Sequence, residues 1–174
     1  MLDIRLWGDP VLRSTARPVE VFDDALARLA QDMLETMRAA PGVGLAAPQV
    51  GADRRLFVYD SGEQSGAICN PEIIWASEET QEVEEGCLSI PDVYLPVTRA
   101  MHVRVRAQDL AGATIVLEAS EFEARIFQHE IDHLDGVLFV DRLTEERRKE
   151  AMRLIREMEV GERPPARPRP AGAL

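Results

Sequence analysis

Residues 129 to 133 read His-Glu-Ile-Asp-His, and their side-chain types and spacing could do chemistry. On an α-helix, positions i and i+4 lie on one face a turn apart, so His129 and His133 can bind a single metal ion. Glu130 then stands beside the ion as a candidate general base towards water. The chain has three histidines, and two of them fall in this motif. The motif predicts a metal-dependent hydrolase and leaves its substrate open.

Such a site needs a third protein ligand, because catalytic zinc-type centres use three and leave one position open for water. A metzincin-like endopeptidase would have a third histidine six residues after His133, where this chain has Phe139. A thermolysin-like peptidase would take a glutamate from a later helix, so Glu150 and Glu157 leave open an alternative function as a zinc endopeptidase. Both lie in a surface-patterned helix with Arg and Lys nearby, which favours a salt-bridge role.

Cys87 is the better candidate for the third ligand. It lies in the segment Glu84-Glu-Gly-Cys-Leu-Ser-Ile-Pro91. Gly86 frees the backbone at the end of a strand, and Pro91 is expected to limit the continuation of that strand, so the thiol should lie at a turn. Cys69 fits the other common role of a free cysteine, a small buried hydrophobic residue. His102 lies in an alternating segment and is interpreted as an ordinary strand residue.

The elements that must position these residues follow from hydrophobic periodicity and capping signals. Gly42 to Gly51 is too rich in small residues for regular structure and reads as a loop. The expected strands lie around residues 56–59, 68–75, 80–84, 102–107 and 114–117. The expected helices run from Asp23 or Asp24 to Pro41-Gly42, through the histidine motif to Asp135-Gly136, and from near Thr144 to Gly161. This order predicts an α+β fold with mainly antiparallel β-sheets packed around a central helix that carries the HExxH motif, with N-terminal and C-terminal helices.

Length and composition indicate one domain. We expect a single catalytic domain over residues 1–161 and a flexible Pro/Arg-rich tail over residues 162–174. No run approaches the roughly 18 apolar residues that a membrane span needs. The N-terminal residues 1–5 resemble neither a signal nor a transit peptide, so we expect the protein in the cytoplasm.

The formal charge of −11 argues against broad adhesion to nucleic acid or anionic membranes. From Thr144 onwards, however, eight Arg and Lys outnumber six Asp and Glu, a local charge of +2 against −13 for the rest. A solvated helix face is the simplest explanation of that excess.

Three separated motifs resemble those of the bacterial peptide deformylase family, in the family's order and at similar spacing. The resemblance extends from roughly Asp3 to Met158, and Val43 stands where many relatives have Ile. It implies removal of the formyl group from the N-terminal formyl-methionine of newly synthesised polypeptides, with release of formate. The motifs are Gly42-Val-Gly-Leu-Ala-Ala-Pro-Gln49, Glu85-Gly-Cys-Leu-Ser89 and Gln128-His-Glu-Ile-Asp-His133.

The resemblance also implies roles for single residues. Glu130 would be the general base, and the Gln49 side-chain amide and the Leu88 backbone N–H would bind the oxyanion. Gly44 would let the loop backbone approach an extended peptide, and Gly42 would do the same. The metal ligands would be Cys87, His129 and His133; the guesses for the methionine pocket are Val43 and Ile126; and the supporting carboxylate would be Glu85, with Arg99 as its partner.

The family's cofactor is one divalent metal ion per chain. A Cys/His/His set is compatible with Zn, Co, Ni or Fe(II), and the resemblance implies Fe(II) in the cell. The expected partners are N-formyl-methionyl nascent peptides, with transient ribosome contact through the last helix or the tail. We expect no specific nucleic-acid readout and no membrane.

Overall fold

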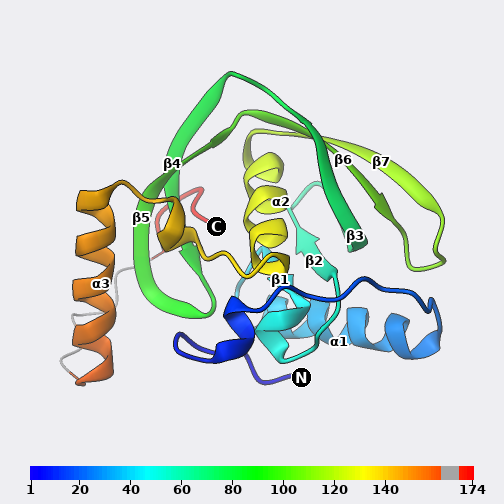
Figure 1. Cartoon of the computed structure of the whole chain (residues 1–174), viewed down its shortest axis with the longest axis horizontal. Coiled ribbons are helices and arrows are strands. Elements are labelled where there is room, and N and C mark those ends of the chain that lie inside the picture. Colours follow the sequence, from blue (N-terminus) through cyan, green and yellow to red (C-terminus); the bar gives the residue numbers. More distant parts are fainter. Residues whose placement is uncertain (162–168) are drawn as a thin grey trace.

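The computed structural model describes residues 1–161 and 169–174 of the chain. It contains antiparallel sheets and three α-helices, which confirms the predicted α+β class. Figure 1 shows α2 in the middle of the molecule, with a long hairpin and α3 on one side and a sheet on the other. The helices are α1 (Asp24–Ala39), α2 (Glu121–Leu134) and α3 (Glu145–Glu159).

The larger sheet has the strand order β1-β2-β3-β6-β7, and all its neighbours are antiparallel. A separate two-stranded sheet is formed by β4 and β5, whose hairpin closes with Cys87 opposite Ile90. Short 3-10 helices η1 (Pro10–Arg13), η2 (Ala47–Val50) and η3 (Phe139–Arg142) link these units. The strands are β1 (Gly44–Ala46), β2 (Leu56–Asp60), β3 (Ser65–Ala76), β4 (Thr80–Cys87), β5 (Ile90–Ala100), β6 (His102–Gln108) and β7 (Thr114–Ser120).

Helix α2 is buried on almost every side because apolar groups cover two of its faces. On the side of the larger sheet, Phe127 packs against Phe57 and Tyr59 of β2, with ring centroids 5.6 and 4.9 Å apart. On the other side, Phe139 of η3 stacks near His129, and its cluster continues into β5 and α3. Helix α2, which carries the histidine motif, is therefore fixed by packing between the two sheets.

The ends of the helices follow the expected chemistry. The Asp23 carboxylate accepts a hydrogen bond from the N–H of Leu26 (2.9 Å), so Asp23, and not Asp24, caps α1. At the end of α2, Gly136 has φ +72°, and an added Cβ would lie 2.6 Å from the backbone oxygen of Arg13. Only glycine meets both conditions, so α2 ends there and the chain turns against η1.

One strand was missed and one local expectation was wrong. Strand β4 ends at Cys87 and a turn follows, as Gly86 and Pro91 led us to expect, but β5, which begins after that turn, was not predicted. The segment Gly42 to Gly51 is not simply a loop, because Gly44–Ala46 pairs with β2 and η2 follows.

The expected tail falls partly outside the described residues, which resume at Arg169. Residues 169–174 lie against the body of the protein, and Ala173 is buried. Among the helices of the described ranges, none combines the length and apolar character that a membrane crossing requires.

Candidate metal centre and active site

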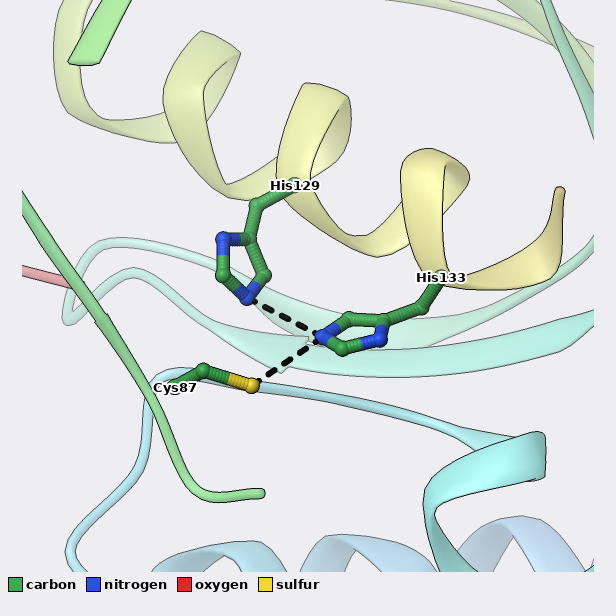
Figure 2. A group of neighbouring side chains, drawn as sticks. All are labelled: Cys87, His129 and His133. Carbon is green, nitrogen blue, oxygen red and sulfur yellow. Dashed lines mark hydrogen bonds between the residues drawn. The ribbon is translucent and has the colours of Figure 1, made fainter. Parts of the chain in front are cut away.

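Three side chains from two elements converge beside α2. His129 and His133 project from one face of the helix, and Cys87 reaches them from the end of β4 (Figure 2). The Nε2 atoms of the two histidines are 3.2 Å apart, and Cys87 Sγ lies 3.3 Å from His133 Nε2. All three ligand atoms lie within 4.8 Å of one another. The structure thus brings together the three residues that the sequence proposed as metal ligands.

The geometry fits a shared cation. Tetrahedral N and S ligands at ordinary zinc-type bond lengths stand about 3.3 to 3.6 Å apart, close to the two separations measured at His133 Nε2. His129 Nδ1 lies 2.7 Å from the Glu85 carboxylate, so this nitrogen carries the proton and the Nε2 lone pair faces His133. Two buried imidazole nitrogens and a sulfur that face one another suit a metal ion better than a hydrogen-bonded cluster.

Glu85 holds His129 in this orientation. Its carboxylate is fully buried and accepts two hydrogen bonds from the Arg99 guanidinium, at 2.8 and 2.9 Å. Burial disfavours the charged form of Glu85, but the hydrogen bonds from Arg99 and His129 outweigh it and hold its pKa at about 2. Glu85 therefore stays ionised, and Arg99 is its partner as the sequence suggested.

The network continues through residues to which the sequence patterns assigned no role. Arg99 also donates to Asp132 (2.7 Å), a residue inside the motif that was given no role. Asp132 in turn accepts two hydrogen bonds from Arg142 of η3, at 2.8 and 3.1 Å. Asp132 follows His129 by three positions on the same helix face, which was the available signal. The network joins β4, β5, α2 and η3 around the ligands.

Glu130 lies beside the ligands in a closely packed position. Its side chain is buried, and its Oε2 atom has no hydrogen-bond partner among the described residues. Burial raises its pKa to about 7. A carboxyl group with that pKa can accept and return a proton near neutral pH.

Gln49 presents its amide nitrogen to the same place. Its Oε1 atom accepts a hydrogen bond from the backbone N–H of Ala46 (2.8 Å), so Nε2 points the other way. Nε2 donates to Ser89 (3.1 Å) and lies 3.6 Å from Cys87 Sγ. The 3-10 turn of η2 fixes this arrangement, because it places Gln49 three residues after Ala46. Ser89, which is buried, was another residue without a predicted role.

A cavity of about 370 Å³ contains most of the predicted residues. Val43, Gly44 and Leu88 line it together with Gln49, Cys87, His129 and Glu130. Ile126 does not line this cavity; it is fully buried within the core cluster against which Val43 packs. Glu150 is exposed on α3, and Glu157 forms an ion pair with Arg153, so neither supports the endopeptidase alternative.

Comparison with known proteins places this chain in a family. Residues 1–149 match the model of the polypeptide deformylase family, a range that contains all three motifs. The chain belongs to the polypeptide deformylase family. Deformylases are metal-dependent hydrolases that remove the formyl group from N-terminal formyl-methionine, and this chain is such an enzyme.

Several deformylases are similar over most of their length. That of Acidothermus cellulolyticus is 53% identical over 156 residues, covering 90% of this chain and 86% of that protein. The crystal structure of peptide deformylase from Thermus thermophilus matches with a TM-score of 0.87 at 49% identity, covering 92% of this chain and 96% of that one. A deformylase from Synechococcus elongatus in complex with actinonin matches with a TM-score of 0.83 at 44% identity, covering 87% and 84%.

Gly44 gives a sharp test of how closely this deformylase packs its site. A Cβ at this position would lie 2.2 Å from Glu130 Oε1, so Gly44→Ala must displace the carboxylate. We expect formate release to fall by about 10²-fold, since a shift of about 1 Å can cost that much. Metal content should stay unchanged. The measurement is kcat for formyl-Met-Ala together with metal analysis.

Gly66→Ala is the matched control. Its added Cβ meets its nearest neighbour, on Tyr59, at an ordinary 3.4 Å, and Gly66 does not line the cavity. Full activity in both variants would show that the packing of Gly44 against Glu130 does not matter to the reaction.

Proposed function

We propose that this deformylase hydrolyses formyl-methionyl peptides with Glu130 as its general base and with Cys87, His129 and His133 as its metal ligands. The observation that carries the proposal is the cluster of the three ligands beside a cavity that Cys87, His129, Glu130 and Gln49 line. A divalent ion held by the three ligands supplies a Lewis acid and makes water nucleophilic near neutral pH.

Glu130 carries the proton from the attacking water to the leaving amine. Its carboxylate accepts a proton from the attacking water as the new C–O bond forms at the formyl carbon. It then returns that proton to the amine nitrogen as the C–N bond breaks, which releases formate and the free N-terminus. The pKa of about 7 suits both transfers.

The charge that develops on the formyl oxygen needs hydrogen-bond donors. We assign them to the Gln49 Nε2 group, whose orientation is fixed by Ala46, and to the backbone N–H of Leu88 in the β4–β5 turn. A neutral amide donates without adding a charge that titrates. One donor of this kind typically contributes about 10² to 10³ in rate.

The substrate class follows from the family and from the shape of the site. We propose that formyl-methionyl nascent peptides bind in extended form along Gly42 to Gly44, with the methionine side chain beside Val43, which packs against the core cluster that contains Ile126. The test uses purified protein with one metal ion per chain and formyl-Met-Ala as substrate. Release of formate is expected, and its absence would contradict the proposed reaction.

Iron is the ion we propose for the cell, with Zn, Ni or Co as other occupants of the same ligands. A cysteine thiolate that binds Fe(II) can be oxidised by the reactive species that form from oxygen. Protein prepared anaerobically should therefore contain more iron and release formate faster than protein prepared in air. Equal iron content and equal activity in both preparations would contradict iron as the working metal.

Residues 1–161 would form the catalytic domain and residues 162–174 a tail, with the enzyme working in the cytoplasm where nascent chains emerge.

Contact with the ribosome would use the exposed basic groups of α3. We expect Lys149→Glu combined with Arg153→Glu to reduce co-sedimentation with ribosomes, while Arg28→Glu on α1 does not. Unchanged co-sedimentation of the α3 variant would contradict the proposed ribosome contact. Recovery of the native enzyme outside the cytoplasm would contradict the proposed cytoplasmic location.

A further inference from the structure

The last residues of the chain lie in the proposed active site. Arg169 and Leu174 line the same cavity as Cys87, His129 and Glu130. In Figure 1 the C-terminus lies between β5 and α2. Leu174 packs against the core cluster that includes Ile126, and Val43 packs against the same cluster. The proposed methionine pocket is thus next to an apolar side chain of the protein itself.

Arg169 fastens this segment in two ways. Its Nε and Nη2 atoms donate to the backbone oxygen of Ala173, at 3.1 and 2.7 Å, which closes residues 169–173 into a turn. Its Nη1 atom donates to the backbone oxygen of Pro41 at 2.6 Å, next to the loop assigned to the substrate. The turn is completed by the N–H of Ala173, which donates to Pro170 at 3.1 Å.

Arg125 of α2 provides a second attachment. Its side chain is buried, its guanidinium lies 5.2 Å from the centre of the Phe122 ring, and its Nη2 atom donates to the backbone oxygen of Gly172 at 2.8 Å. Its Nε and Nη1 atoms have no partner among the described residues. A buried guanidinium with unused donors is costly, so a peptide carbonyl here is a favourable ligand.

We propose that the segment Arg169–Leu174 is an internal ligand of the active site, held by Arg125 and by the Arg169–Pro41 contact, and that it competes with the formyl peptide. The proposal rests on the proposed assignment of the substrate pocket. The segment offers what a short peptide offers: backbone carbonyls for hydrogen bonds and an apolar side chain, Leu174. The enzyme binds its substrate only when the segment has left.

The covalent link makes a weak contact effective. Seven residues separate Gly161 from Arg169 in the sequence, and binding within one chain has an effective concentration on the order of millimolar when the connection is short. A segment that would bind at about 1 mM as a free peptide then raises the apparent KM about 3- to 10-fold. The kcat is unchanged, because saturating substrate displaces the segment.

The experiment compares full-length variants on formyl-Met-Ala-Ser. Leu174→Asp and Arg169→Gln each remove a contact that holds residues 169–174 in the cavity. Both variants should lower KM about 3- to 10-fold with kcat unchanged. Val116→Asp is the matched control, since Val116 is an exposed aliphatic residue on β7 that does not line the cavity. An unchanged KM in both segment variants would overturn the proposal.

A binding measurement separates this proposal from the assigned reaction. The synthetic peptide Arg-Pro-Ala-Gly-Ala-Leu is titrated by calorimetry into metal-loaded Leu174→Asp protein and into the unmodified protein. If neither the unmodified protein nor any variant releases formate, the proposed reaction is wrong, and this titration alone then tests the internal ligand. Binding to the variant and not to the unmodified protein would support the internal ligand, and equal heats in both would overturn it.

Discussion

Glu130→Gln is expected to keep the metal and the fold while formate release falls by about 10²- to 10⁴-fold, the range that general acid–base catalysis contributes. The glutamine keeps the size of the side chain but cannot accept the proton of the attacking water. The three ligands and the Glu85–Arg99 pair are untouched by the change. The measurements are kcat for formyl-Met-Ala, metal content and thermal unfolding.

Glu123→Gln is the control for this prediction because it makes the same change on the same helix. Glu123 is half-buried near Ser61 and does not line the cavity. Its variant should keep wild-type kcat. A Glu130→Gln protein that releases formate at the wild-type rate would remove Glu130 from the proton path, whatever its metal content.

Cys87→Ser should lose the metal and, with it, activity by at least about 10²-fold. A serine hydroxyl does not ionise near neutral pH and is a poor replacement for a thiolate ligand. His129 and His133 would be left as a two-ligand site, which binds divalent ions far more weakly. Metal content per chain after dialysis is the direct measurement, with formate release as the second.

Cys69→Ser makes the same atomic change at the other cysteine. Cys69 is fully buried in an apolar cluster beneath α1, and burial raises the pKa of its thiol to about 11. The variant should lose about 1 to 3 kcal/mol of stability and keep its metal. If Cys87→Ser protein also keeps its metal and activity, the third ligand is another residue.

Much of the site could be predicted because its signals are local. The spacing of His129 and His133 fixes a shared helix face, and the turn around Gly86 places Cys87 at a strand end. Each of these two inferences needs one element and its immediate neighbour. The pairing of Glu85 with Arg99, fourteen positions apart, came from the family resemblance, because the strand that holds Arg99 was not predicted.

The remainder depends on which segments meet in space, and sequence patterns carry little information about that. Strand β5 was not predicted, and it contains Pro91 and Pro96, residues that count against a strand when only the sequence is read. Ile126 was placed in the pocket, but the 3.6-residue period turns it into the core. Arg125 gave no signal, since its contact with Gly172 joins residues forty-seven positions apart.

The three-ligand cluster joins parts of the chain that are distant in sequence. Cys87 and His133 are forty-six positions apart, and Gln49 lies thirty-eight positions before Cys87. An unfolded chain cannot hold these groups together, so an ion bound there favours the folded state by mass action. At a free metal concentration one hundred times the dissociation constant, this linkage amounts to about 2.7 kcal/mol. The supply of metal then affects the stability of the folded enzyme as well as its activity.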